Sequence, residues 1–242
     1  MRISWTKYST KEECSLRYNL VYVRRIPERR SRLVFLVGSV VHDTIRSWAQ
    51  SGYEVDFIQR KVVEEFKLQS VGINFKSKGT YIMYLQRAIK GALVAQEIYK
   101  QLQFKDHGAI VEFRFKAELF ESGMESALLN GASDVYDPIR KSIYDMKLNT
   151  SMDSVDRGQL LTYAVAFQCM GHEVERGAFI QPIRPNKLIK FEFTNDEIHN
   201  HKLLLQQSAA EMQQGVIPVA NIGCKACFFC GYKGSTHCPG KD

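Results

Sequence analysis

The stretch GASDVYDPIRKSIYDMKLNTSMDSVDRGQLLTY, residues 131–163, carries the pattern that decides the fold. It holds an isolated acid, then an acid and a lysine two residues apart, then a glutamine and a tyrosine four residues apart. On a β-strand, side chains at i and i+2 share a face, so Asp145 and Lys147 point the same way. On the helix predicted by the apolar spacing that follows, Gln159 and Tyr163 also share a face. We therefore expect one site on a strand-turn-helix unit.

Length and composition indicate one globular domain. A chain of 242 residues is long enough for one sizeable core, or for a core with a small appended module. No segment approaches the roughly 18 uninterrupted apolar residues of a membrane span. The first residues lack the basic-then-apolar layout of a secretory signal. We therefore expect a soluble protein in a reducing cytoplasm, or in the host cytoplasm if a phage encodes it, with no membrane partner and with free thiols.

Charge and cysteine placement narrow the class further. The 33 Lys and Arg exceed the 26 Asp and Glu, which gives a formal charge of +7 and favours polyanionic partners. Of the six cysteines, four crowd into residues 224–242, namely Cys224, Cys227, Cys230 and Cys238. Such crowding near one end predicts a metal site.

The first part of the chain, about residues 1–105, reads as helical. Ser9 or Thr10 is a candidate cap for a helix over residues 9–23 that carries Cys14. An apolar stripe predicts a second helix over 33–49 with His42 beside the stripe. Residues 54–103 read as mostly helical, with a break at 72–79.

The pattern changes to strands near residue 110. Alternation predicts strands over 110–119 and 128–136, followed by the strand with Asp145 and Lys147, which together form an antiparallel meander. Asp153 and Ser154 precede the helix predicted over 159–170. Two strands over 174–182 and 188–194 and a helix over 195–214 follow. The fold class is α/β, with a mixed sheet of the α+β type.

Two acids near a lysine suit a divalent metal beside a phosphodiester. Mg²⁺ and Mn²⁺ prefer carboxylate and carbonyl oxygens, so Asp134 and Asp145 can hold the ion, with the carbonyl of Met146. Lys147 would stabilise an attacking hydroxide or the developing charge. By itself Asp-x-Lys is far more commonly a surface ion pair, and a lone His such as His42 is commonly structural. Asp137 reads as a turn residue before Pro138, and Glu112 and Glu118 as contacts behind the site or solvent-facing strand residues.

The combined spacing resembles a known family. Gly38-x-x-x-His42, Gly131-x-x-Asp134, Asp145-x-Lys147 and Gln159-x-x-x-Tyr163 look like the PD-(D/E)xK nucleases of the RecB-like branch. The sequence is similar to the CRISPR-associated and phage-encoded RecB-like exonucleases. The resemblance implies a restriction-endonuclease-like core flanked by helices, in a single domain over 1–242. Its helical part is about 1–105, its nuclease core about 106–215 and its cysteine-rich tail 216–242.

The resemblance also implies roles for individual residues. The Mg²⁺ or Mn²⁺ ligands would be His42, Asp134, Asp145 and Met146, and the catalytic set would be Asp134, Asp145, Lys147, Gln159 and Tyr163. Many members clasp a [4Fe-4S] cluster between one early cysteine and three late ones. That clasp would use Cys14, Cys227, Cys230 and Cys238, with Cys224 as the rival ligand. Zinc is the alternative metal, and Cys169 is expected to be a core thiol.

The resemblance implies an exonuclease that acts on DNA in replication, recombination, repair or CRISPR-type processing. Its substrate would be single-stranded DNA or DNA with free ends, with helicase, recombination or CRISPR integration proteins as possible partners. Two alternatives stay open at the level of sequence. One is a binding or adaptor protein that keeps the fold without catalysis, and the other is a structure-specific endonuclease.

Overall fold

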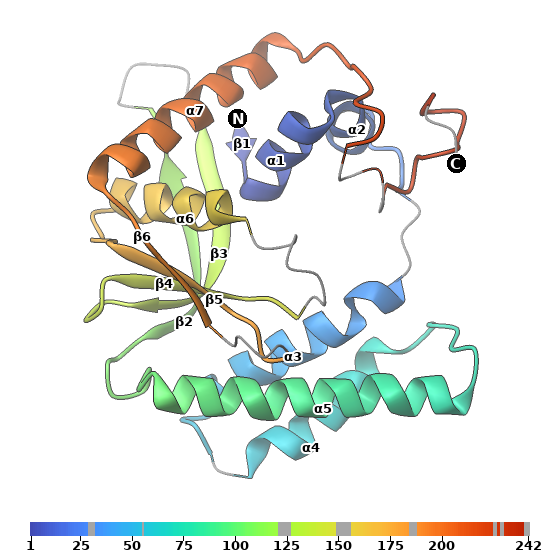
Figure 1. Cartoon of the computed structure of the whole chain (residues 1–242), viewed down its shortest axis with the longest axis vertical. Coiled ribbons are helices and arrows are strands. Elements are labelled where there is room, and N and C mark those ends of the chain that lie inside the picture. The colour runs from blue at the N-terminus through green and yellow to red at the C-terminus, as the bar shows by residue number, and fades with distance from the viewer. Residues whose placement is uncertain are drawn as a thin grey trace.

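A computed structural model describes residues 1–28, 32–54, 56–120, 127–148, 156–183, 188–224, 227 and 230–239. A single mixed sheet is surrounded by helices (Figure 1). The strands are β1 (Arg2–Ile3), β2 (Ile110–Glu118), β3 (Leu128–Asp137), β4 (Ser142–Met146), β5 (Arg176–Ile180) and β6 (Leu188–Glu192). The helices are α1 (Trp5–Glu13), α2 (Ser15–Tyr18), the π-helix η1 (Asn19–Val23), α3 (Arg32–Gln50), α4 (Phe57–Gln69), α5 (Lys78–Gln101), α6 (Arg157–Cys169) and α7 (Asn195–Gln214).

The sheet combines a meander with a crossover. β2, β3 and β4 pair antiparallel in chain order, as the sequence predicts. After β4 the chain passes through α6 and returns in β5, which lies parallel to β4, and β6 then pairs antiparallel with β5. The two-residue strand β1 lies parallel to the start of β3 and is too short to give a sequence signal.

Two apolar clusters cover the two faces of this sheet. On one face, α6 and α7 pack over the sheet residues Phe115 and Phe179, and Phe167 of α6 lies in the same cluster. On the other face, α3, α4 and α5 pack over Val135, Tyr144 and their neighbours. Figure 1 shows α6 and α7 above the sheet and α3, α4 and α5 below it. The sheet therefore lies between two layers of helices.

Local signals explain where the later helices begin. The Asp156 carboxylate accepts a hydrogen bond from the Gly158 amide and caps α6. The side chain of Thr194 and that of Glu197 form a capping box at α7. The predicted start signal at Asp153 and Ser154 lies outside the described residues. Among the described residues, no helix is long and apolar enough to cross a membrane.

The helix predicted over residues 9–23 is wrong. Cys14 has φ −161° and ψ 102°, so the backbone is extended there and separates α1 from α2. The cause is a contact that is distant in sequence. The Leu16 amide donates to the Val219 carbonyl at 3.0 Å, and the Ser15 hydroxyl donates to the Ile217 carbonyl at 3.0 Å. Pairing with the C-terminal tail therefore overrides local helix propensity.

Candidate active site

Two carboxylates stand side by side on neighbouring strands. Because Val135 pairs with Tyr144 in the antiparallel β3–β4 ladder, the next pair along it is Asp134 with Asp145. Their side chains share the face of the sheet on which α6 packs. α3 reaches the same place from the other layer and presents His42. The packing of the two layers on the sheet thus brings distant acids and a histidine together.

Asp134 is held from two sides. Its Oδ2 accepts a hydrogen bond from the Met146 amide at 2.5 Å, and its Oδ1 lies 3.0 Å from His42 Nδ1. Burial disfavours a charged imidazole, but the Asp134 carboxylate outweighs burial and raises the pKa of His42 to about 9. Burial likewise works against the Asp134 charge, and His42 overcomes it and lowers the pKa of Asp134. The pair is therefore ionic at neutral pH.

Asp145 has a different environment. Its Oδ2 lies 2.6 Å from Lys147 Nζ, and its Oδ1 accepts from Gln159 Nε2 at 3.0 Å and from the Tyr163 hydroxyl at 3.4 Å. Burial is the largest influence and raises the pKa of Asp145, although Lys147 opposes that effect. Burial also raises the pKa of Tyr163 well above its ordinary value, which keeps the phenol neutral as a donor.

The structure thus brings together all the residues that the sequence analysis placed at the site. Lys147 lies one residue beyond the end of β4, but its amide donates to the Ile180 carbonyl at 2.8 Å and continues the ladder. The site carries two adjacent carboxylates, one imidazole and one ammonium. Met146 contributes its backbone, whose amide already binds Asp134.

These donors suit a hard divalent ion, since two carboxylates and a backbone carbonyl are the oxygen ligands that Mg²⁺ and Mn²⁺ prefer. In the part of the chain that the structure describes, no three His, Cys, Asp or Glu side chains form a ready-made metal site. The donors of the site already have partners: Asp134 binds His42, and Asp145 binds Lys147. A cation that takes Asp145 as a ligand competes with Lys147 for that carboxylate, and one that takes His42 as a ligand must also displace a proton from the imidazole.

Three acids outside the predicted site have defined places. Glu112 is neither free nor solvated, because it binds Arg46 of α3 at 2.8 Å and Arg114 at 2.7 Å. Its φ of 54° is unusual for a strand residue, and it lies across from Asp134 in the β2–β3 register. Asp137 is fully buried and accepts from the Arg140 amide at 3.0 Å, as expected for a turn residue. Glu118 is exposed.

Sequence reasoning missed Gln181, which directly follows β5. Its side chain is fully buried, and neither its Nε2 nor its Oε1 has a hydrogen-bond partner in the described part of the chain. The available signal was a lone glutamine between Ile180 and Pro182 in an otherwise apolar run. A polar side chain in such a position needs a partner or a function.

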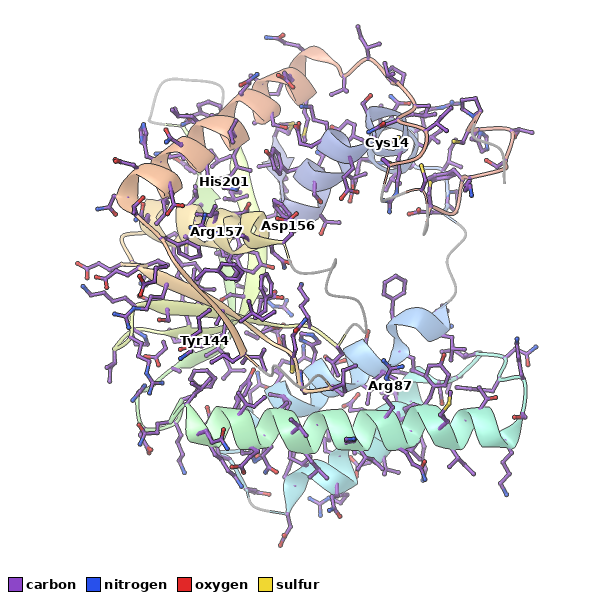
Figure 2. The ribbon with its side chains drawn as sticks, in the orientation of Figure 1. Cys14, Arg87, Tyr144, Asp156, Arg157 and His201 are labelled. Atoms are coloured by element: carbon purple, nitrogen blue, oxygen red, sulfur yellow. The ribbon has the colours of Figure 1, made fainter. Side chains whose placement is uncertain are left out.

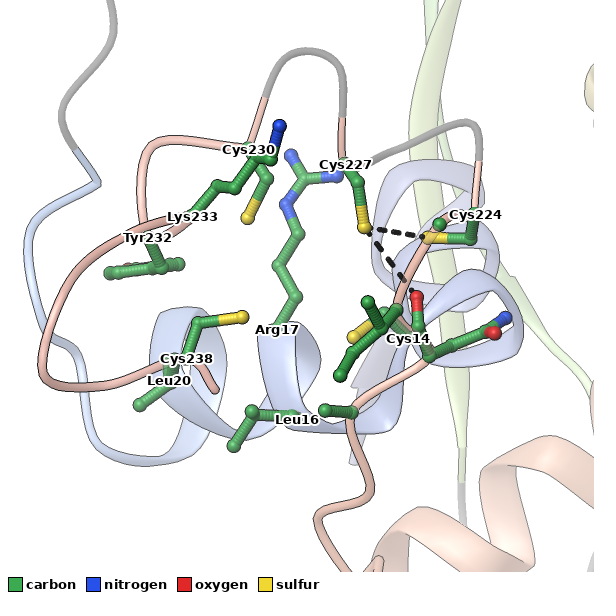
Figure 3. A pocket seen from close by; sticks show the side chains of 14 residues that line it. Cys14, Leu16, Arg17, Leu20, Cys224, Cys227, Cys230, Tyr232, Lys233 and Cys238 are labelled. Atoms are coloured by element: carbon green, nitrogen blue, oxygen red, sulfur yellow. Dashed lines mark hydrogen bonds between the residues drawn. The ribbon is translucent and has the colours of Figure 1, made fainter. Parts of the chain in front are cut away.

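The cysteines of the two chain ends meet in a separate cavity of about 260 Å³. Figure 2 shows Cys14 at the C-terminal tail, far from Tyr144, the neighbour of Asp145. Figure 3 shows the cysteine side chains arranged around that of Arg17, which binds Glu28 at 3.2 Å. The cysteines that line the cavity are Cys14, Cys224, Cys227, Cys230 and Cys238.

The spacing of the thiols limits what the cavity can hold. The sulfur atoms of Cys224 and Cys227 lie 3.5 Å apart. Two thiolates on different irons of a cubane must lie further apart than two on a single zinc, because bridging sulfides separate the irons. Only one of this pair can therefore ligate such a cluster in this arrangement. Cys169 lies elsewhere, partly buried on α6 against the core.

Comparisons with known proteins show the family to which this chain belongs. The profile of the PD-(D/E)XK nuclease superfamily matches residues 2–236. The chain therefore belongs to the PD-(D/E)XK nuclease superfamily. No curated protein matches it in sequence.

Two solved structures are similar to this chain. One, from Eubacterium rectale, is named as a candidate exonuclease; it aligns over 94% of this chain and 87% of its own length, with 15% identity and a TM-score of 0.54. That likeness supports the fold. A second, named SSO0001, aligns over 98% of this chain and 97% of its own, with 14% identity and a TM-score of 0.41. A score that low carries no argument.

Proposed function

We propose that this chain is a Mg²⁺- or Mn²⁺-dependent deoxyribonuclease that hydrolyses phosphodiester bonds from DNA ends. The observation that carries the proposal is the adjacent pair Asp134 and Asp145, with Lys147 at 2.6 Å from the second acid. An adaptor that had lost catalysis would not need to keep a buried acid with a raised pKa beside a lysine.

Each residue has a role that follows from its contacts. His42, Asp134, Asp145 and the Met146 carbonyl would hold the ion, which when bound polarises the phosphate and acidifies a water. Lys147 would place a positive charge where the attacking oxygen and the phosphoryl oxygens of the transition state carry negative charge. Gln159 and Tyr163 donate to Asp145 Oδ1 and fix the orientation of that carboxylate. Exact placement of this kind is a large part of catalysis.

The preference for DNA ends rests on resemblance. The Gln159-x-x-x-Tyr163 helix and the cysteine-rich tail resemble end-processing RecB-like enzymes, and the net charge of +7 suits a polyanion. Single-stranded DNA or DNA with free ends is the expected substrate. Helicase, recombination or CRISPR integration proteins are the class of partner that such an enzyme would serve, in a cytoplasmic compartment.

The test uses linear and circular DNA, single- and double-stranded, labelled at an end or internally, with and without Mn²⁺. We expect metal-dependent cleavage of linear substrates and none of closed circles. Asp145→Asn should abolish cleavage, whereas Asp196→Asn on the exposed start of α7 should cleave like wild type. Cleavage of closed circles would favour an endonuclease. Full activity in Asp145→Asn, or DNA binding without cleavage by wild type, would refute the catalytic assignment.

We also propose that the cysteine cavity holds a [4Fe-4S] cluster, with Cys14, Cys227, Cys230 and Cys238 as ligands and Cys224 as the rival of Cys227. Support comes from five thiols around one cavity and from Arg17, whose charge suits a cluster held by thiolates. Burial raises the pKa of the Cys230 thiol, so an iron ion bound there would have to displace the thiol proton. Anaerobic purification tests this, because a colourless protein with stoichiometric zinc and no iron would contradict it.

A further inference from the structure

Gln181 carries a fully buried side-chain amide. Both polar atoms lack a partner among the described residues, although buried polar groups in native proteins are nearly always satisfied. An orphaned amide destabilises the fold, and a partner that the side chain meets in another state of the protein would offset that cost. The question is which state and which partner.

The β4–β5 register places Gln181 beside Lys147. Asp145 pairs with Phe179 and Met146 with Ile180, so the next step of the parallel ladder is Lys147 with Gln181. The Lys147 amide bonds to the Ile180 carbonyl at 2.8 Å, so the two chains still run together at this point.

The alternation of side chains supports the same placement. Met146 and Ile180 face the α3–α5 layer. Their successors Lys147 and Gln181 therefore face the opposite layer, where Lys147 Nζ already lies 5.7 Å from the centre of the Phe179 ring. The amide and the ammonium group thus share the face that carries Asp145.

We propose that Gln181 is a positioning residue that accepts a hydrogen bond from Lys147 when Asp145 binds a metal ion. Without metal, Lys147 is paired with Asp145 at 2.6 Å, and the Gln181 side chain has no hydrogen-bond partner among the described residues. When the Asp145 carboxylate binds a divalent cation, the half-buried ammonium group of Lys147 loses its partner. The Gln181 carbonyl then accepts from the ammonium group and keeps it beside the reacting phosphate. The inference rests on the proposed function, because it assumes that Asp145 binds the ion.

The first experiment compares Gln181→Met with wild type. Methionine has a similar length and no strong polar atom, so the metal-free protein should melt at a higher temperature. Without the acceptor, opening the Lys147–Asp145 pair costs more, and Mn²⁺ affinity measured calorimetrically without DNA should fall about tenfold. On cleavage, kcat should fall with little change in KM for DNA. The matched control is Gln96→Met. Gln96 is also buried with an unpartnered Nε2, but it lies on α5, in the helical layer on the other side of the sheet.

A double-mutant cycle tests whether Lys147 is the partner. In a Lys147→Met background, Gln181→Met should leave Mn²⁺ affinity unchanged, because no ammonium group needs an acceptor. A lower melting temperature of metal-free Gln181→Met, unchanged Mn²⁺ affinity, or a loss of affinity that persists in the Lys147→Met background would each overturn the inference. Wild type that binds Mn²⁺ but cuts no DNA would overturn the proposed function alone. Wild type that binds no Mn²⁺ would overturn both.

Discussion

The candidate active site and the cysteine cavity are built in opposite ways. At the active site, strands and helices of the core present the side chains, and these satisfy one another: His42 with Asp134, and Lys147 with Asp145. In the cavity, cysteines from a helix break and a tail surround a hollow of about 260 Å³. Contacts among its own side chains hold the first site together, whereas the second is a hollow lined by thiols. Loss of a ligand should therefore affect chemistry in one region and folding in the other.

Lys147→Met should produce the largest effect, and it should be confined to catalysis. Loss of the ammonium group that pairs with Asp145 should lower kcat by about a thousandfold, the size expected for removing one charge-stabilising group. Single-turnover cleavage measures the change, and Mn²⁺ binding should persist. Lys141→Met, which removes an exposed lysine bound to Glu173 and Glu175, is the control. A small change in kcat would show that Lys147 is not part of the chemistry.

Cys230→Ser should lower the stability of the fold and leave catalysis largely unchanged. Cluster binding contributes to folding, and a loss of about 3 to 5 kcal/mol would lower the melting temperature by about 10 °C in a chain of this size. Iron content and visible absorption should fall too, while cleavage at low temperature should persist. Cys169→Ser is the control, since its thiol lies on α6 outside the cavity. Equal melting temperatures for both variants would indicate that no cluster stabilises the fold.

Gly131→Ala should damage the scaffold beneath the active site. A Cβ at Gly131 would lie 2.7 Å from Cζ of Phe115, its cross-strand partner. Phe115 is buried and cannot swing away, so we expect a loss of about 1–3 kcal/mol in denaturant unfolding. Gly38→Ala is the control, because a Cβ there meets nothing within 4 Å. Adding Phe115→Leu to Gly131→Ala should recover part of the loss, and failure to do so would point to another cause.

The smallest effect concerns pH. The pKa of His42 is raised from 6.5 to about 9 in the folded protein. Its pairing with Asp134 therefore stabilises the metal-free fold fully below about pH 6.5, and this contribution is lost as pH rises through about 9. Between pH 7 and 10, wild type in chelator should lose more melting temperature than His42→Gln, whose amide does not titrate. Parallel profiles would contradict the ion pair.

The sequence predicted the fold where signals were local. The strand alternation, the two-residue spacing of Asp145 and Lys147 and the helical spacing of Gln159 and Tyr163 all act over a few residues, and the meander and α6 follow from them. The convergence of His42 on Asp134 was implied by the family resemblance, and the structure places the two 3.0 Å apart. The catalytic roles of these residues stay predictions until the variants are measured.

Prediction from the sequence failed where contacts between distant segments determine the local structure. The break at Cys14 arises from backbone pairing with Val219, which no helix propensity reports. The left-handed backbone at Glu112 and the lack of a described hydrogen-bond partner for the buried Gln181 amide likewise depend on how strands and layers meet. A residue whose role depends on a neighbour distant in the chain gives only a weak signal in its own stretch of sequence.

The closing of the cysteine cavity has a consequence for the order of synthesis. Cys14 Sγ lies at the Val219 carbonyl, 205 residues along the chain. A ribosome makes Cys14 before it makes Val219 and Cys238, so a growing chain carries an incomplete cavity until both have been added. Leu20, a fully buried residue, lines the same cavity. A finished cavity therefore marks a chain that has been translated at least as far as Cys238.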